Sequence, residues 1–215
     1  MKKLDAIVLG ATGATGQEIL SRLLKDEGFK SVSIFVRKKP EMSHSKLIVH
    51  EINFSKIENY KELIKGDILF SCLGTTLKNA GSKEKQYQVD YTYQYEFAKT
   101  ASRNGVSYYS LVSSAGANAN TFFFYPRIKG KLEEAVKKLS FKTIHIFQPP
   151  ILIRQEPLIR TGEKIAINVF HKLNSLGLLK SQKPLPVATL ANRMINEIKE
   201  STKKEIRIYT PKEIF

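Results

Sequence analysis

Cysteine is almost absent from this chain of 215 residues, which carries a single thiol, Cys72. One cysteine excludes an internal disulfide and a cysteine-cluster zinc site, and it is compatible with a reducing compartment. The four histidines, His44, His50, His145 and His171, are dispersed without metal-ligand spacing. We therefore expect no bound metal and a cytoplasmic location.

Long apolar runs are also absent, and none approaches the roughly 20 apolar residues that a membrane span needs. The opening residues MKKLDAIVLG differ from a signal peptide because Asp5 interrupts a short apolar stretch. Acidic residues are scarce relative to basic ones, 20 against 35, so the formal net charge is +15. The cations are scattered rather than gathered in one tract, so we expect no nucleic-acid or membrane partner; a phosphorylated cofactor would suit this charge.

The remaining composition, 42% hydrophobic and 26% charged, is that of an ordinary folded domain. The length suits one domain with a sizeable core. We expect a single dinucleotide-binding domain over residues 1–215, in which residues 151–215 contribute a short substrate cap.

The segment GATGATG directly follows the apolar run AIVLG and precedes apolar residues at helical spacing. In a dinucleotide-binding turn the first glycine lets the chain reverse, the second lets the backbone approach a pyrophosphate, and the third lets the helix pack against the strand. The N–H groups at the helix start then face the anion. A ligand-free turn is the alternative, but the position behind the first strand favours nucleotide binding. The expected cofactor contacts are Gly10, Thr12, Gly13, Ala14, Thr15 and Gly16.

The second predicted strand, SVSIFVRKK, ends in Arg37 and Lys38, where an NAD-selecting enzyme usually carries Asp or Glu. A cation at this position favours the 2′-phosphate of NADP. No carboxylate follows before Glu41. We therefore expect NADPH rather than NAD at Arg37 and Lys38, although they could also be two of many surface cations.

Apolar runs alternate with amphipathic segments along the chain. The runs AIVLG, SVSIFV, KLIVHEI, DILFSCLG, SYYSLVSS and KTIHIFQ predict six strands. One interleaved helix is expected from about Tyr87 to Asn104, and another carries Leu132 and Val136 on its core-facing side. This order predicts an α/β fold, a doubly wound parallel sheet of Rossmann type with helices on both faces.

Chemistry in such a sheet takes place at the carboxyl ends of the strands. Three segments end there after the glycine turn: CLGTT behind the fourth strand, LVSSAGA behind the fifth and QPPIL behind the sixth. Their small residues would let the backbone run beside a cofactor. The further cofactor contacts that we expect are Leu73, Gly74, Thr75, Ser113, Gln148, Pro149 and Ile151.

Tyr125 and Lys129 follow the serine pair and are four residues apart, so a helix would place both side chains on one face. A phenol with a pKa of about 10 exchanges protons poorly at neutral pH until a nearby cation stabilises its anion. Lys129 would supply that cation, and both residues would contact the cofactor. Ser114, or its neighbour Ser113, would donate a hydrogen bond to the substrate oxygen.

Tyr95 and Lys99 repeat this spacing but lack a serine-tipped strand upstream, so we interpret them as a helix-surface pair. Pro126 restricts Tyr125 to non-helical geometry and predicts that the next helix begins there. The aromatic run of residues 122–124 is expected to pack near the cap or to line an apolar pocket rather than to form an exposed patch. The tyrosines at 87, 91, 93 and 95 indicate core and interface packing.

These residues resemble the short-chain dehydrogenase/reductases, in the atypical branch with the glycine pattern GATGATG. SSAGANANTFFFYPRIKGKLEEAVKKL, FQPPIL and PLPVATLANRMI are similar to the Tat-interacting-protein-like oxidoreductases, and the likeness covers nearly the whole chain. It implies NADPH binding and a catalytic set of Ser114, Tyr125 and Lys129. Asp90, in QYQVDY, stands where an asparagine is common, so the usual fourth member of the proton relay differs.

The expected reaction is hydride transfer between nicotinamide and a small carbonyl or alcohol, with Tyr125 exchanging the proton, Lys129 lowering the pKa of Tyr125 and Ser114 orienting the substrate. The resemblance also admits a non-catalytic NADPH sensor or protein-binding scaffold. A nucleotide-sugar epimerase or dehydratase is the third interpretation, which the short cap disfavours. A homodimer is compatible with each.

Overall fold

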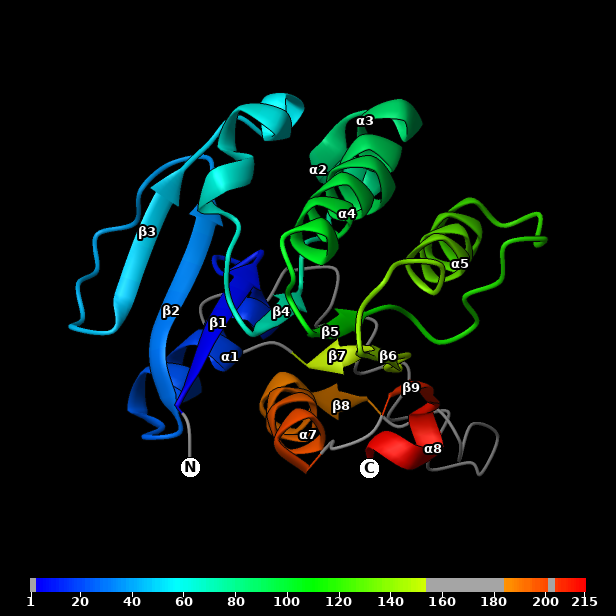
Figure 1. Cartoon of the computed structure of the whole chain (residues 1–215). Helices are drawn as coiled ribbons and strands as arrows, with labels where there is room; N and C mark the ends of the chain where they lie inside the picture. Colours follow the sequence, from blue (N-terminus) through cyan, green and yellow to red (C-terminus); the bar gives the residue numbers. More distant parts are fainter. Residues whose placement is uncertain (1–2, 154–183, 201–203) are drawn as a thin grey trace.

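A computed structural model describes residues 3–153, 184–200 and 204–215 and shows a parallel sheet between two layers of helices (Figure 1). The main sheet has seven strands in the order β3-β2-β1-β4-β5-β6-β9, and every neighbouring pair is parallel. The predicted doubly wound α/β fold is therefore confirmed. The strands are β1 (Leu4–Leu9), β2 (Phe29–Val36), β3 (Leu47–Glu51), β4 (Ile68–Ser71), β5 (Tyr108–Val112), β6 (Thr143–Phe147) and β9 (Glu205–Tyr209), with β7 (Leu152–Ile153) and β8 (Leu185–Pro186) forming a separate two-stranded ladder.

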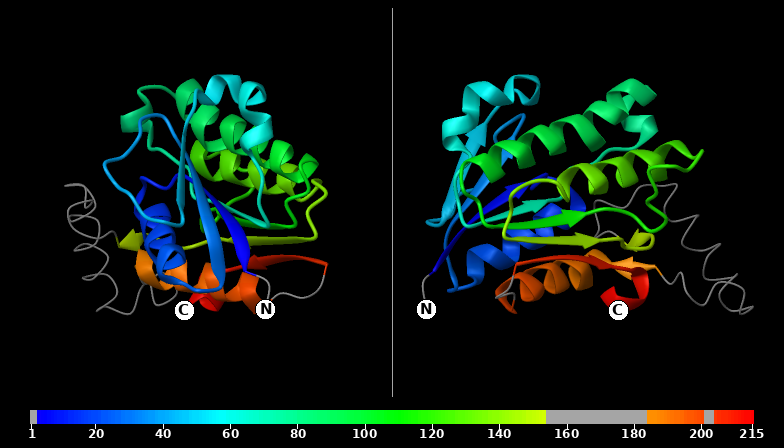
Figure 2. Two further views of the ribbon diagram at one scale, coloured as in Figure 1. Left: turned by 60° about the vertical axis from the view of Figure 1, so that its left-hand side comes forward. Right: turned by 45° about the vertical axis from the view of Figure 1, so that its right-hand side comes forward.

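The helices divide between the two faces of the sheet, as the two turned views show (Figure 2). α1, α7 and α8 cover one face, and η1, α4 and α5 cover the other. Their bounds are α1 (Ala14–Lys25), α2 (Leu77–Ala80), α3 (Lys83–Tyr87), α4 (Gln94–Arg103), α5 (Phe124–Val136), α7 (Val187–Glu200) and α8 (Pro211–Ile214), with a 3-10 segment η1 (Phe54–Leu63) and a π-helical turn η2 (Gln88–Tyr93).

The central strands are apolar on both sides because both sides are covered. In β1, Ala6 and Val8 belong to the core beneath α1 and α7, whereas Ile7 and Leu9 belong to the core beneath α4 and α5. Alternate side chains of a strand point to opposite faces, so a continuous apolar run is what such a strand requires. The six strands predicted from these runs are all present.

The helix expected from about Tyr87 to Asn104 is present but is not uniform. It begins as α3, passes through the π-helical turn η2, continues as α4, and is capped by Asn104 before Gly105 at φ +84°. The π turn carries Asp90, whose side chain is fully buried. Single π turns inside helices are frequent at functional sites.

Two expectations for the segment before α5 are wrong. The helix begins at Phe124, so Tyr125 lies in its first turn; Pro126 is tolerated there because first-turn N–H groups have no partner within the helix. Phe122 and Phe123 are 97% and 75% exposed, because they lie on the loop before the helix rather than against the core. Phe124 alone is half-buried.

No helix in the described ranges is long and apolar enough to cross a membrane. The tyrosines of α3, η2 and α4 are half-buried, and three of them, Tyr87, Tyr91 and Tyr95, stack in a row with ring centroids 4.9 and 5.9 Å apart. Lys99 lies 5.8 Å from the centre of the Tyr95 ring and pairs with Glu96. Tyr95 and Lys99 thus form a pair on the helix surface.

Candidate functional site

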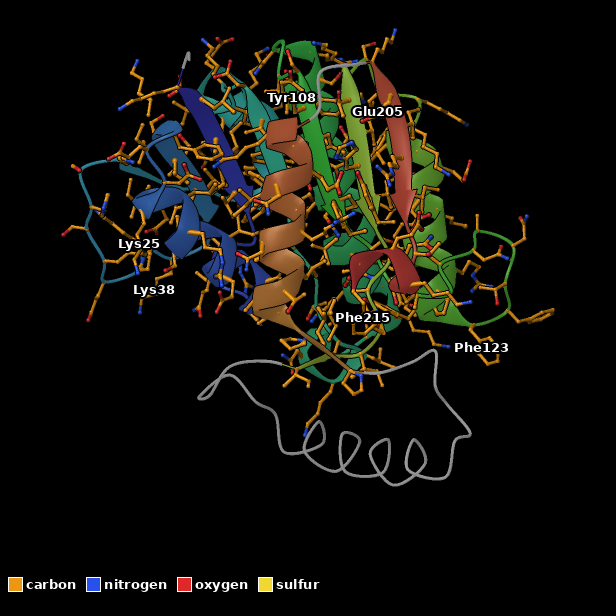
Figure 3. The ribbon with its side chains drawn as sticks, turned by 90° about the horizontal axis from the view of Figure 1, so that it is seen from below. Lys25, Lys38, Tyr108, Phe123, Glu205 and Phe215 are labelled. Atoms are coloured by element: carbon orange, nitrogen blue, oxygen red, sulfur yellow. The ribbon has the colours of Figure 1, made fainter. Side chains whose placement is uncertain are left out.

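A cavity of about 1310 Å³ opens at the carboxyl ends of the strands, larger than the roughly 300–1,000 Å³ of most small-ligand pockets. Seen from below, Tyr108 and Glu205, which begin β5 and β9, lie at one end of the sheet, and Phe123 and Phe215 lie toward the other (Figure 3). The cavity is lined by residues 13–15 of the glycine turn, residues 72–77 and 112–116 behind β4 and β5, Lys83, Gln86, Phe124, Tyr125, Lys129, residues 149–152, Val187 and residues 210–212.

The glycine turn is built around two positions that accept no side chain. Gly10 has φ +82°, and a Cβ there would lie 2.6 Å from main-chain atoms of Cys72 and Leu73. A Cβ on Gly16 would collide with the Gly10 carbonyl, so this glycine sets the close approach of α1 to β1. Gly13 caps α1 without a side-chain hydrogen bond and leaves the first-turn N–H groups available to an anion. The turn therefore fits a dinucleotide pyrophosphate.

Tyr125, Lys129 and Ser114 line the same cavity as the glycine turn. Tyr125 is 39% exposed at the wall, whereas Lys129 is only 2% exposed and donates a hydrogen bond from Nζ to the Val112 carbonyl at 3.0 Å. The Ser114 hydroxyl donates to the Ala115 carbonyl at 3.2 Å and is partly exposed. The structure thus brings together the three residues that the sequence predicts as catalytic.

Lys129 is a buried cation between two buried carboxylates. Burial lowers the pKa of Lys129, and the charges of Asp90 and Glu133 oppose that shift. Burial likewise raises the pKa of Asp90, against the effects of Lys129 and of the Thr75 N–H that donates to its Oδ2 at 3.0 Å. The other Asp90 oxygen has no hydrogen-bond partner in the described chain. The wall behind Lys129 therefore contains a titratable group at the position of the family's common asparagine.

Glu133 is a site residue that the sequence analysis missed. It is 4% exposed, and its carboxylate accepts a hydrogen bond from the Ser113 hydroxyl and two from the Gln148 amide, at 3.0 and 3.1 Å. Four residues separate it from Lys129, and that helical spacing is the signal that could have identified it. Gln148 was expected to contact the cofactor, but its amide is directed to this carboxylate, because a buried carboxylate requires donors.

The other expected cofactor contacts divide into two groups. Arg37 and Lys38 follow the end of β2, are exposed, and lie outside the lining of the main cavity. A smaller cavity of about 340 Å³, lined in part by Thr12 and Pro40, lies between α1 and the residues behind β2. The expected contacts that do line the main cavity are Gly13, Ala14, Thr15, Leu73, Gly74, Thr75, Ser113, Tyr125, Lys129, Pro149 and Ile151.

Among the residues that the structure describes, no group of three or more His, Cys, Asp or Glu side chains is placed to hold a metal ion. Cys72 lines the cavity, and burial raises the pKa of its thiol to about 12. A thiol in that state is a poor nucleophile. The candidate chemistry therefore depends on the phenol, the ammonium and the hydroxyl at the wall.

Residues 10–146 match the family described as NAD(P)H-binding. This chain belongs to the NAD(P)H-binding family. Its relatives include protein HTATIP2 of Rattus norvegicus, 30% identical over 92% of this chain and 82% of the relative. Another is protein FMP52-1, mitochondrial, of Scheffersomyces stipitis, which is 32% identical over 94% of this chain and 91% of the relative. These relatives confirm the resemblance to the Tat-interacting-protein-like branch.

Solved structures share the fold of this NAD(P)H-binding chain at low sequence identity. The Bordetella bronchiseptica enzyme WbmG in complex with NAD superposes with a TM-score of 0.72 at 14% identity, over 97% of this chain and 73% of that one. UDP-glucose 4-epimerase of Thermotoga maritima superposes with a TM-score of 0.69 at 13% identity, over 95% of this chain and 76% of that one. Likeness at this identity shows the Rossmann-like fold alone.

Proposed function

We propose that this chain is an NADPH-dependent oxidoreductase that transfers a hydride to or from a small carbonyl or alcohol substrate. The observation that carries the proposal is that one cavity joins the pyrophosphate-binding turn at Gly13 to Tyr125, Lys129 and Ser114. A cofactor held at the turn and a substrate held at the phenol would therefore share one cavity.

In carbonyl reduction, each of the three residues Tyr125, Ser114 and Lys129 would have a separate role. Bound NADPH supplies the hydride to the carbonyl carbon. Tyr125 donates a proton to the oxygen that becomes the alcohol, and Ser114 donates a hydrogen bond that orients this oxygen. Lys129, fixed by its bond to the Val112 carbonyl, would supply the positive charge that stabilises the phenolate and would hold the nicotinamide ribose.

The preference for NADPH rests on Arg37 and Lys38, exposed directly after β2. A guanidinium binds a phosphate through paired hydrogen bonds, so it suits the 2′-phosphate. One carboxylate lies nearby, because Glu51 at the end of β3 accepts the Lys39 main-chain N–H at 3.0 Å. A carboxylate at this edge would suit the ribose hydroxyls of NAD instead.

Cofactor titrations test this preference. Dissociation constants for NADPH and NADH would be measured by cofactor fluorescence for the wild type, Arg37→Gln and Glu51→Gln. We expect NADPH to bind more tightly than NADH, and Arg37→Gln to weaken NADPH about tenfold or more while NADH changes little, since an ion pair to a phosphate is lost. Tighter NADH binding that depends on Glu51 would contradict the proposal.

Turnover is tested by NADPH oxidation against a panel of aldehydes, ketones and quinones. Oxidation of at least one class supports the reductase. Tight cofactor binding with no turnover would favour the non-catalytic sensor. Conversion of a nucleotide sugar without net cofactor consumption would favour the epimerase.

The proposed compartment is the cytoplasm, a proposal supported by the low cysteine content of the chain, whose one cysteine, Cys72, is not in a disulfide. The fungal relatives are named as mitochondrial proteins. Fractionation of cells that express the tagged full chain would test the proposal, and recovery in the mitochondrial fraction would contradict it.

A further inference from the structure

The described wall of the main cavity carries lysines but no carboxylates. Lys83, Lys129 and Lys212 line it, and no Asp or Glu of the described residues does. Lys129 is compensated by two buried carboxylates behind it. Lys83 and Lys212 are exposed and form no salt bridge with the residues that the structure describes. A concave site lined by one sign of charge attracts ligands of the opposite sign.

Both lysines lie on the substrate side of the cavity. Lys212 follows β9, which is four strands from β1 in the sheet, so the axes of these two strands are about 19 Å apart at about 4.8 Å per strand. The ammonium of Lys83 lies 5.7 Å from the centre of the Phe124 ring, and Phe124 directly precedes Tyr125. A pyrophosphate at the turn would therefore lie several strands away from Lys212, and Lys83 lies over the ring of the residue that precedes Tyr125.

The rest of the wall is largely apolar. Leu77, Ile151, Leu152 and Val187 contribute to it, together with the half-buried ring of Phe124. Such a surface favours a ligand with an apolar body. An anionic group at one end of that body would then reach the lysines.

We propose that the substrate is a carbonyl compound with an apolar body and a carboxylate or phosphate group, and that Lys83 and Lys212 bind this anionic group. The inference rests on the proposed oxidoreductase function and names the substrate class for the same site. In this proposal, the glycine turn binds the pyrophosphate of the cofactor, and Lys83 and Lys212 bind the anionic group of the substrate.

The test compares benzaldehydes with para substituents of different charge, on the NADPH-loaded full chain. Benzaldehyde carries no anionic group, 4-carboxybenzaldehyde carries a carboxylate, and 4-formylphenyl phosphate carries a phosphate. The variants are Lys83→Gln, Lys212→Gln and their double, with Lys131→Gln as the matched control, an exposed lysine of α5 outside the cavity lining. We expect kcat/KM for one anionic probe to exceed that for benzaldehyde about tenfold, and each cavity variant to reduce that advantage about fivefold.

Several outcomes would overturn the inference. The first is an equal kcat/KM for the charged and neutral probes in the wild type. The second is that the Lys83 and Lys212 variants lose as much kcat/KM with benzaldehyde as with the anionic probe. The third is that Lys131→Gln reduces kcat/KM for the anionic probe as much as the cavity variants do. Weaker NADPH binding by the Lys83 and Lys212 variants would show that these lysines hold the cofactor instead.

A binding measurement separates this inference from the proposed function. Benzoate would be titrated into the NADPH-loaded protein and followed by cofactor fluorescence. If no aldehyde is turned over but benzoate binds and loses affinity in the double variant, the reductase fails and the anion site stands. If aldehydes are reduced but benzoate binding is unchanged in the double variant, the anion site fails and the reductase stands.

Discussion

The Ser113 hydroxyl donates a hydrogen bond to the Glu133 carboxylate across 20 residues of sequence. This bond joins the end of β5 to the middle of α5. Gln148, directly behind β6, donates to the same carboxylate. Since α5 also carries Tyr125 and Lys129, one buried carboxylate fixes the candidate catalytic helix against the ends of two strands.

Replacing Glu133 with Gln should destabilise the protein. The Gln side chain keeps one oxygen acceptor but adds an N–H₂ group that faces existing donors, so at least one buried group loses its partner. We expect a loss of about 1–3 kcal/mol in the free energy of unfolding, measured by urea denaturation. The control is Glu134→Gln on the same helix, where an exposed pair with Lys137 contributes little and the change should stay within about 0.5 kcal/mol. Equal effects of the two substitutions would argue against this role for Glu133.

Tyr125→Phe should reduce turnover of any identified substrate by at least about 100-fold, because the proton donor is lost while the ring remains. NADPH affinity should stay nearly unchanged. Tyr95→Phe is the matched control, since Tyr95 and Lys99 have the same spacing but lie on the surface of α4 outside the cavity lining. Full activity of Tyr125→Phe, measured by NADPH oxidation, would rule out the assignment.

Asp90→Asn should change how stability depends on pH. Burial raises the pKa of Asp90, so the folded protein retains this proton at pH values where the unfolded chain has released it. The contribution of Asp90 to stability therefore falls as the pH rises from about 4 through its raised pKa. The stability of Asp90→Asn relative to wild type should increase over that window, measured by urea unfolding at successive pH values. A difference that is flat or decreases with pH would contradict the direction of the shift.

Gly10→Ala should reduce the free energy of unfolding by more than the positive φ of this residue alone explains. Gly10 and Gly105 have nearly the same φ, +82° and +84°, but a Cβ meets main-chain atoms at 2.6 Å only at Gly10. Gly105→Ala should lose about 1–2 kcal/mol, the cost of the left-handed conformation. Gly10→Ala should lose at least about 2 kcal/mol more and bind NADPH poorly. If Gly10→Ala and Gly105→Ala lose the same stability in thermal or urea unfolding, the structure relieves the contact between the new Cβ and the main chain without loss of stability.

The sequence was sufficient to predict what depends on local patterns. Five of the six predicted strands lie inside the sheet and are largely buried, and the glycine turn follows the first strand of the chain. The sixth, β3, is an edge strand with no fully buried residue, and it was predicted from the apolar run KLIVHEI. β9, at the other edge, was not predicted; Ile206 is 53% exposed there, and charged residues alternate with apolar ones. The alternation in EIRIY leaves no continuous apolar run in β9 from which a strand would be predicted.

Within the site, the gathering of Tyr125, Lys129 and Ser114 followed from spacing and strand order. The bonds of Glu133 could not be predicted, because they join three segments whose register is set only by folding. Propensity places a glutamate on a helix, but it does not show that the residue is buried. The exposure of Phe122 and Phe123 was missed for a related reason, since composition does not reveal which side of a loop faces the core.

The position of β9 in the sheet has a consequence for biosynthesis. β9 pairs with β6, and Thr210, Pro211 and Lys212 behind it form part of the cavity wall. During translation the glycine turn and the helix with Tyr125 leave the ribosome long before these residues do. The nucleotide cradle is thus synthesised early, but the compartment for the second reactant is completed only after residues 210–212 have emerged.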